Sequence, residues 1–342
     1  MDEERKREFQ QSVDAAFDEE IKKIHEQLDQ DLLIALVGEV NAGKSSTINK
    51  IIGKDVAKTN PQPGETISID PYNLAGLEKI KLMDTPGLND PHDENPKKTE
   101  AFIGQADIIL FFTNAAGTVF SDSEKAKFQE IAAHNENILI VLNKIDAAED
   151  IENLVEFIKQ HAGSQYDVVP ISSKTGQNID VLKDRILELL EKKGKDILFA
   201  KSLQDKSTTA KRWINAAGVS AGVIGASPIP GSDVVPLTAL QVGLTLKLAT
   251  LYDKPLTKKA AKDLIIVTAT KTAGQTAYRQ IVKFVPGAGS IAGGLVASSF
   301  TLALGYGIKY AYENNMPIDE EIIFELYKKY KKRKDYKQQP EN

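Results

Sequence analysis

The chain has 342 residues, 42% of them apolar, with a formal net charge of −5 and no cysteine. This length favours two domains and the apolar content is enough for a buried core, while the lack of cysteine excludes disulfide bonds and cysteine metal sites. The four histidines show no metal-ligand spacing, and the first residues, MDEERKREFQ, are too polar for a secretory signal, so we expect a cytoplasmic protein.

The charge is unevenly distributed along the chain. Residues 1–194 hold 22 Lys and Arg against 36 Asp and Glu, whereas residues 195–342 hold 21 against 12. A basic C-terminal part suits either an anionic partner surface or a set of solvated helices.

Residues 1–30 are predicted to form an amphipathic helix. Apolar residues recur among charged ones at every third or fourth position: Phe9, Val13, Phe17, Ile21, Ile24 and Leu28. Such a face needs a partner, and we expect it to pack on the C-terminal domain.

Residues 31–192 are predicted to form an α/β domain. Short apolar runs alternate with helical patterns, and the runs are LLIALV, KIKLMD, DIILFFT, NILIVLN and DVVPIS. Strands without polar alternation are buried on both faces, which is typical of a mostly parallel, doubly wound sheet covered by helices.

A phosphate-binding loop follows the first of these strands. The segment GEVNAGKSS fits the pattern G-x-x-x-x-G-K-S and leads into the helical run SSTINKII. Backbone N–H groups of such a loop surround phosphate oxygens, the lysine neutralises charge between the β- and γ-phosphates, and the serine hydroxyl binds Mg²⁺. The candidate phosphate-binding residues are Gly38, Asn41, Ala42, Gly43, Lys44, Ser45 and Ser46.

Three further motifs follow at strand ends. KLMDTPG places Asp84 where a carboxylate holds Mg²⁺ through water and Gly87 where an N–H meets the γ-phosphate. NKID and ISSK then supply a candidate base site, in which a carboxylate accepts both N–H donors of guanine, an arrangement that adenine does not match. The candidate base-binding residues are Asn143, Lys144, Asp146, Ser172, Ser173 and Lys174.

With these four motifs in this order, residues 31–190 resemble the small GTPase domains of the translation-factor-related class, above all the Era and TrmE branch. The resemblance implies GTP or GDP as the ligand and Mg²⁺ as the metal, bound by Ser45 and by a switch threonine, for which PGETIS supplies Thr66. Family members usually carry paired threonines there, and Glu65 occupies the first position in this chain.

Two residues bear on hydrolysis. Ras-like members place a water-orienting glutamine after the D-x-x-G motif, whereas this chain has Leu88 there, so another group must support hydrolysis. Asn41 occupies the position at which Era- and TrmE-like proteins carry an asparagine that helps to bind K⁺, and the other reading is a residue that only tolerates a turn. The candidate catalytic residues are Asn41, Lys44, Thr66 and Gly87.

Residues 193–337 are predicted to form an all-helical domain with a duplicated hairpin and a basic tail. QVGLTLKLATLYDKPLT from Gln241 aligns without a gap with ALGYGIKYAYENNMPID from Ala303, and each copy follows a Pro-Gly turn. In each copy a helix ends before a proline, and Thr257 or Asp319 then stands at the expected N-cap of the next helix.

Two stretches of this domain carry almost no charge. Residues 213–246 contain one charged residue and residues 284–308 contain none, and each stretch is long enough to cross a bilayer. They are rich in small residues and interrupted by prolines, so a tightly packed helical bundle and a membrane-inserting hairpin both remain open.

The tail YKKYKKRKDYK, residues 327–337, suits anionic lipid headgroups, a solvated helix end or RNA. RNA ranks last, because no GXXG loop on a strand-containing domain of the Era kind is present. The back half resembles an uncharacterised helical domain found behind Era-like GTPase domains, and the layout is similar to immunity-related and dynamin-like GTPases.

The sequence thus predicts a GTP-binding and GTP-hydrolysing P-loop protein that acts at a membrane surface, with nucleotide-dependent dimers or oligomers and without nucleic acid. The alternatives are a soluble regulatory module read by a protein partner and, third, an RNA- or ribosome-associated GTPase.

Overall fold

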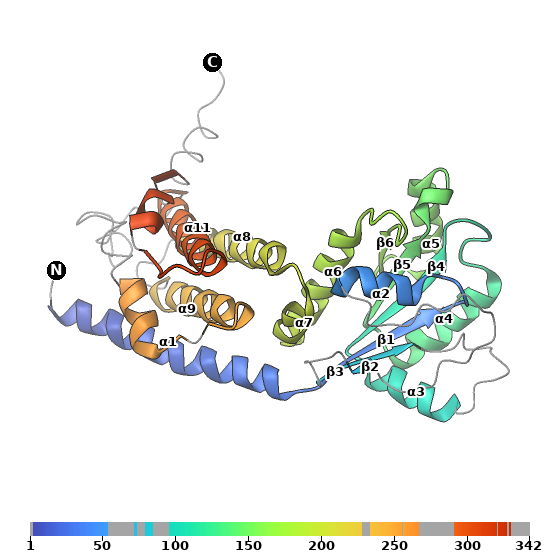
Figure 1. Cartoon of the computed structure of the whole chain (residues 1–342), viewed down its shortest axis with the longest axis horizontal. Coiled ribbons are helices and arrows are strands. Elements are labelled where there is room, and N and C mark those ends of the chain that lie inside the picture. The colour runs from blue at the N-terminus through green and yellow to red at the C-terminus, as the bar shows by residue number, and fades with distance from the viewer. Residues whose placement is uncertain are drawn as a thin grey trace, which may run out of the picture. The chain divides into compact units, whose positions relative to one another are not determined.

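The computed structural model of the chain describes residues 3–53, 72–73, 79–84, 96–227, 233–254, 256–266, 291–319, 321–326 and 328–329. These residues form two compact units (Figure 1). The sheet unit spans Gln27–Gln204, and the helical unit combines Met1–Glu26 with Asp205–Asn342. The helical unit is therefore built from both ends of the chain.

The sheet unit contains a six-stranded sheet in the order β2-β3-β1-β4-β5-β6. Its strands are β1 (Leu32–Gly38), β2 (Tyr72–Asn73), β3 (Ile80–Asp84), β4 (Ile108–Asn114), β5 (Ile138–Asn143) and β6 (Asp167–Pro170). Five strands are parallel, as the five apolar runs predict, and the side chains of β1, β4 and β5 are almost all buried. The short strand β2, which pairs antiparallel with β3, has no apolar run and was missed by sequence reasoning.

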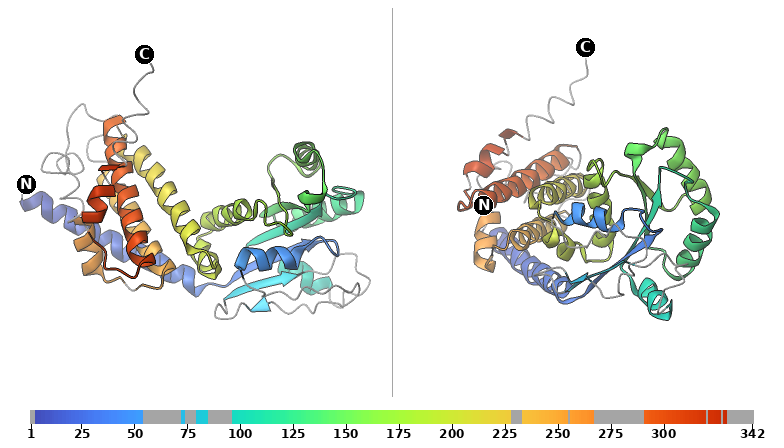
Figure 2. Two further views of the ribbon diagram at one scale, coloured as in Figure 1. Left: turned by 45° about the horizontal axis from the view of Figure 1, so that its top comes forward. Right: turned by 45° about the vertical axis from the view of Figure 1, so that its right-hand side comes forward.

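Helices cover both faces of this sheet (Figure 2). They are α2 (Lys44–Ile52), α3 (Pro96–Gln105), α4 (Asp122–His134), α5 (Ile151–Ala162), α6 (Ile179–Lys192) and α7 (Asp196–Ser202), with a 3₁₀ turn η1 (Ile145–Ala147). One face packs against α3, α4 and α5 around Phe111, Phe120 and Phe128, whose rings meet edge to face at 5.4–6.1 Å. The other face carries α2 and α6, which contact β1, β4 and each other. The doubly wound α/β arrangement is confirmed.

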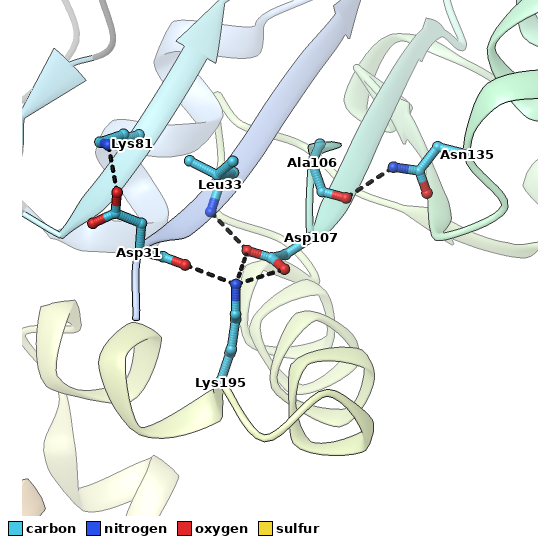
Figure 3. A network of polar contacts seen from close by, with 7 residues as sticks. All are labelled: Asp31, Leu33, Lys81, Ala106, Asp107, Asn135 and Lys195. Atoms are coloured by element: carbon cyan, nitrogen blue, oxygen red, sulfur yellow. Dashed lines mark hydrogen bonds and ion pairs between the residues drawn. The ribbon is translucent and has the colours of Figure 1, made fainter. Parts of the chain in front are cut away.

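A polar network holds the edge of the sheet at which the parallel strands begin (Figure 3). The Lys195 ammonium donates to both carboxylate oxygens of Asp107, at 2.8 and 2.7 Å, and to the Asp31 carbonyl at 2.7 Å. The Leu33 N–H donates to the same Asp107 carboxylate at 2.9 Å, and Lys81 pairs with the Asp31 side chain. The network thus joins the chain before β1, the start of β4 and the segment after α6.

The helical unit contains α8 (Lys206–Gly225), α9 (Val234–Leu251), a helix described over residues 258–266, α11 (Ile291–Glu313) and most of α1 (Glu3–Asp29). The side chains of Phe9, Val13, Phe17 and Ile24 on α1 are buried, as their spacing predicts. Two ion pairs at 2.6 Å, Asp14–Lys262 and Asp18–Lys258, join α1 to the helix at 258–266.

Among the described helices of this unit, α8 and α11 pack most closely. Gly225 lies against Ala297, and a Cβ on Gly294 would lie 2.5 Å from the Gly222 carbonyl oxygen. The glycines have no side chain, and this lets the two backbones approach closely, as small residues do in water or in lipid. Over the part of the chain that the structure describes, no helix combines the length and apolarity needed to span a membrane.

The two aligned segments end in the same backbone geometry. Asp253 and Asn315 adopt φ of 55° and 52°, and the N–H of the next residue returns to Ala249 or Ala311 at 2.8 Å in each copy. The predicted N-caps are confirmed: Thr257 Oγ1 accepts from the Ala260 N–H at 3.2 Å, and Asp319 Oδ1 accepts from the Glu321 N–H at 2.8 Å.

The two units meet along the chain at a point different from the expected boundary after residue 192. Helix α7 is largely buried and packs on α6, and residues up to Gln204 lie in the sheet unit. The helical unit begins at Asp205, which caps α8.

Candidate nucleotide-binding site

The loop between β1 and α2 has the backbone that a phosphate-binding loop requires. Gly43 adopts φ 88°, and a Cβ there would lie 2.1 Å from the Asn143 amide nitrogen, so only glycine fits. Asn41, at φ 65°, is exposed at the loop tip. Ala42 is buried, while Ser45 and Ser46 lie in the first turn of α2, whose N-terminus carries partial positive charge.

Lys44 is held within the loop. Its side-chain ammonium donates to the carbonyl oxygens of Gly38 at 2.9 Å and Glu39 at 3.2 Å, and the residue is only 9% exposed. The cation therefore already lies over the concave side of the loop, where phosphate oxygens bind in such sites. A loop whose conformation requires glycine at position 43 and a buried lysine cation together fit a nucleotide phosphate group.

Asn143 links this loop to the candidate base site. Its amide nitrogen donates to the Ala42 carbonyl at 2.8 Å and to Ser173 Oγ at 3.1 Å, and its amide oxygen accepts from the Ser173 and Lys144 N–H groups. Both ends of the amide are thus used within the protein. Sequence reasoning assigned Asn143 to guanine, which stays a prediction, and the structure adds that this side chain holds two loops together.

The Asp146 carboxylate is held in position by Ser172 and lies near Lys174. The Ser172 hydroxyl donates to its carboxylate at 2.6 Å and accepts from the Thr175 N–H at 3.1 Å, and the Lys174 ammonium lies 3.8 Å away. The hydrogen bond from Ser172 lowers the pKa of Asp146, with smaller contributions from the charges of Lys174 and Lys144. The carboxylate is therefore ionised at neutral pH and able to accept two N–H groups of a base.

The predicted metal residues are only partly described. Asp84 ends β3, and its Cα pairs with that of Leu36, two residues before the loop. Asp84 therefore ends its strand at the same edge of the sheet as the phosphate-binding loop. Thr66, Gly87 and Leu88 lie outside the described residues, so the structure does not bear on their predicted roles.

One buried group beside the loop was missed by sequence reasoning. Glu124 caps the start of α4 by accepting from the Ser121 N–H at 2.8 Å, while Ser121 Oγ accepts from the Glu124 N–H at 3.3 Å. Burial raises the pKa of Glu124, and the nearby charge of Glu39 in the phosphate loop adds to the increase. The available signal was the spacing S-x-x-E before a helical run, which is a capping box.

Comparison with known proteins agrees with this geometry. Residues 33–144 match the family described as 50S ribosome-binding GTPase, and residues 192–313 match a domain of unknown function, DUF697. GTPase Era of Vibrio vulnificus is 29% identical over 189 residues, and tRNA modification GTPase MnmE of Borreliella burgdorferi is 29% identical over 174. Residues 33–144 therefore form an Era-like P-loop GTPase domain, followed by a helical domain of a second family.

The alignments with these relatives span about half of this chain and no more than 58% of either relative. The alignments cover 53% of this chain and 58% of Era, and 49% of this chain and 37% of MnmE. A solved Aquifex aeolicus Era variant bound to GDP and AlF4⁻ is 28% identical over 47% of this chain and 57% of that one, with a TM-score of 0.39. A further Era structure, 28% identical over the same shares with a TM-score of 0.38, holds MgGDPNP and nucleotides of 16S ribosomal RNA.

Proposed function

We propose that this chain binds GTP with Mg²⁺ and hydrolyses it to GDP and phosphate, and that the bound nucleotide sets the state of the helical unit. The observation that carries the proposal is the contact of Asn143 with both Ala42 and Ser173. This contact supports the proposal because it joins the loop after β1 to the segment after β6, both at the carboxyl edge of one parallel sheet, where nucleotides bind in open α/β folds.

Each residue has a task in this proposal. Loop N–H groups and Lys44 bind the phosphates, and Asp146 accepts from guanine beside the Ser173 backbone. Ser45 and Thr66 hold Mg²⁺, with Asp84 acting through a water and the Gly87 N–H near the γ-phosphate. Bound Mg²⁺ neutralises charge that develops on the transferred phosphate group.

The role of Lys44 is tested by calorimetric titration with GTP. Lys44→Ala removes a charge-assisted contact with phosphate, and we expect affinity to fall by about 100-fold, or roughly 3 kcal/mol. Lys50→Ala, on the exposed side of the same helix, is the matched control and leaves affinity unchanged. Unchanged binding in Lys44→Ala would remove the phosphate assignment.

The choice of base is tested at Asp146. Asp146→Asn replaces one acceptor with a donor, so the variant should prefer xanthosine triphosphate, which offers an oxygen where guanine offers an amino group. Competition binding measures the preference. Retained preference for GTP would place the base elsewhere.

Hydrolysis needs a substitute for the missing glutamine at Leu88. We assign part of this task to K⁺ bound near Asn41, and part to a second copy of the chain that meets the site across the nucleotide. Turnover should be faster in KCl than in NaCl and should rise with protein concentration. Equal rates in the two salts rule out the K⁺ contribution, and rates per molecule that stay constant with concentration rule out the dimer.

A membrane surface is the proposed place of action. The support is the basic tail at 327–337, which matches anionic headgroups in charge, although it lies almost wholly outside the described residues. Flotation with anionic liposomes, in the GDP state and with a non-hydrolysable GTP analogue, measures binding. Failure to float in both states would favour a regulatory module read by a protein partner.

A ribosome-associated role is the second candidate. It is favoured by the match of residues 33–144 to the family described as 50S ribosome-binding GTPase, which stands against our expectation of no nucleic-acid partner. Co-sedimentation with ribosomal subunits in the presence of the GTP analogue, with no flotation, would select this role.

A further inference from the structure

The chain passes from the sheet unit to the helical unit between Gln204 and Asp205. Gln204 is fixed to the carboxyl end of α2, because its main-chain N–H donates to the Ile52 carbonyl oxygen at 3.3 Å. Helix α2 is the helix that begins at the phosphate loop. The last residue of the sheet unit is thus bound to the far end of the nucleotide-binding helix.

The side chain of Gln204 lies beside the glycine that ends α2. Gly53 ends α2 in the left-handed region at φ 80°, and its N–H returns to the Asn49 carbonyl at 2.9 Å. A Cβ on Gly53 would lie 2.5 Å from Gln204 Oε1 and 2.9 Å from Gln204 Cβ. The Gln204 side chain therefore lies directly over the glycine, on the face where any other residue would place its side chain.

Helix α2 is well suited to transmit a displacement between its two ends. It is nine residues long, or about 13 Å, and both of its ends are glycines with positive φ. Ile48, Ile51 and Ile52 are buried along its inner face. Because a packed helix moves as one body, a shift of the phosphate loop also shifts the residues at the end of α2 that contact Gln204.

The residue directly after Gln204, Asp205, already belongs to the helical unit. Asp205 caps α8, accepting from the Thr208 N–H at 3.1 Å and from the Thr208 hydroxyl at 2.6 Å. Lys206 then pairs with Asp253 at the end of α9, at 2.8 Å. One peptide bond separates a residue held by α2 from a residue held by α8.

We propose that the contact of Gln204 with Ile52 and Gly53 at the end of α2 transmits the nucleotide state to the helical unit; this connection at residues 204–205 is called the joint below. This inference rests on the proposed function, because it requires the phosphate loop to bind nucleotide. It assigns to Gln204 and Gly53 a coupling role that is separate from binding or hydrolysis, since neither residue belongs to the phosphate or base site.

The only tryptophan of the chain provides the readout. Trp213 lies on α8, is 3% exposed and has the Lys247 ammonium 5.3 Å from its ring centre. Its fluorescence reports on the helical unit alone, because the sheet unit has no tryptophan. In the wild-type chain we expect different emission with GDP and with a non-hydrolysable GTP analogue.

The decisive variant inserts two glycines between Gln204 and Asp205. The insertion leaves the contacts within each unit intact and adds slack only at the joint, so both nucleotides should bind with unchanged affinity while the difference in Trp213 emission is lost. The same insertion between Gly163 and Ser164, in the turn between α5 and β6, is the matched control and keeps the difference. Gln204→Ala, at an exposed position, should reduce the difference without impairing folding.

The outcomes separate this inference from the proposed function. No calorimetric binding of either nucleotide to the wild-type chain contradicts the proposed function and the coupling with it. Binding without a nucleotide-dependent change at Trp213 contradicts the coupling and the proposed control of the helical unit, but not the proposed GTP binding and hydrolysis. A change that survives the insertion at the joint also contradicts it, and assigns transmission to the other connection between the units, at residues 26 and 27.

Discussion

At the scale of single residues, Glu124 is the buried carboxylate whose ionisation we expect to affect stability. Burial, with a smaller contribution from the charge of Glu39, raises its pKa above the value in an unfolded chain. Its contribution to stability is therefore largest below the unfolded pKa and is lost as the pH rises through the folded one. Glutamine retains an oxygen that accepts from the Ser121 N–H but does not ionise.

Glu124→Gln should thus gain stability relative to wild type as the pH rises from the unfolded pKa of glutamate through the raised pKa of the folded state, because only the wild type then ionises a buried group. Denaturation followed by hydrogen exchange of β4 and β5 amides measures the sheet unit alone. Glu136→Gln, at an exposed position, is the control. A difference between Glu124→Gln and wild type that is independent of pH would contradict the prediction.

The residues that the sequence predicts well are those whose pattern and chemistry coincide. Lys44 and Asp146 stand in short motifs at strand ends; in the structure Lys44 bonds to the Gly38 carbonyl of the loop, and Asp146 accepts from Ser172. The amide of Asn143 shows the limit, because its partners Ala42 and Ser173 are distant in sequence and only the fold brings them within 3.1 Å. A motif predicts what a residue can bond but not which of several partners it meets.

At the scale of elements, the packing of α8 on α11 depends on particular glycines. A Cβ on Gly294 would lie 2.5 Å from a backbone oxygen of α8, whereas a Cβ on Gly222 would find ordinary contacts at 3.5 Å and beyond. Gly294→Ala should therefore force the helices apart and destabilise the helical unit by about 1–3 kcal/mol, the usual cost of overpacking.

Gly222→Ala is the matched variant on the facing helix. It should be neutral or stabilising by up to about 1 kcal/mol, because alanine favours the helix and no atom need move. Chemical denaturation followed by Trp213 fluorescence measures both variants, since that side chain lies on α8. Equal effects of the two substitutions would show that the close approach does not limit the side chain at 294.

The five parallel strands were predictable because each is a mainly apolar run, and the ends of α9 and α11 because proline and N-cap residues follow them. The short β2 has no such run, and its two residues owe their strand geometry to pairing with β3. The close packing of α8 on α11 was not predictable either, because small residues permit close packing in water or in lipid and do not indicate which helix is the partner.

At the scale of the whole molecule, the chain crosses between its two units at residues 26–27 and 204–205. The Lys195 network connects the segment before β1 with the segment after α6 through Asp107. Sequence reasoning placed the boundary at residue 192, where the composition changes and where the match to DUF697 begins, while the contacts of α7 with α6 keep that helix in the sheet unit.

Lys195 should therefore matter more to the sheet unit than a surface lysine does. The side chains of Lys195 and Asp107 are only 16% and 11% exposed, so Lys195→Met leaves a largely buried carboxylate with the Leu33 N–H but without its cation. We expect a loss of about 3 kcal/mol, as when one partner of a buried pair is removed. Lys183→Met, which removes a lysine paired with the 72% exposed Asp180, is the control and should cost less than about 1 kcal/mol.

The double variant Lys195→Met with Asp107→Asn separates the cost of an unpaired charge from the loss of the connection itself. If the unpaired carboxylate causes the loss, the added Asp107→Asn substitution should restore much of the stability, because a neutral amide costs less to bury and still offers an oxygen to the Leu33 N–H. If stability is not restored, the bond from Lys195 to the Asp31 carbonyl carries the effect, by holding the chain before β1 to the segment after α6. Hydrogen exchange of β1 and β4 amides distinguishes these results, since both strands begin at the network.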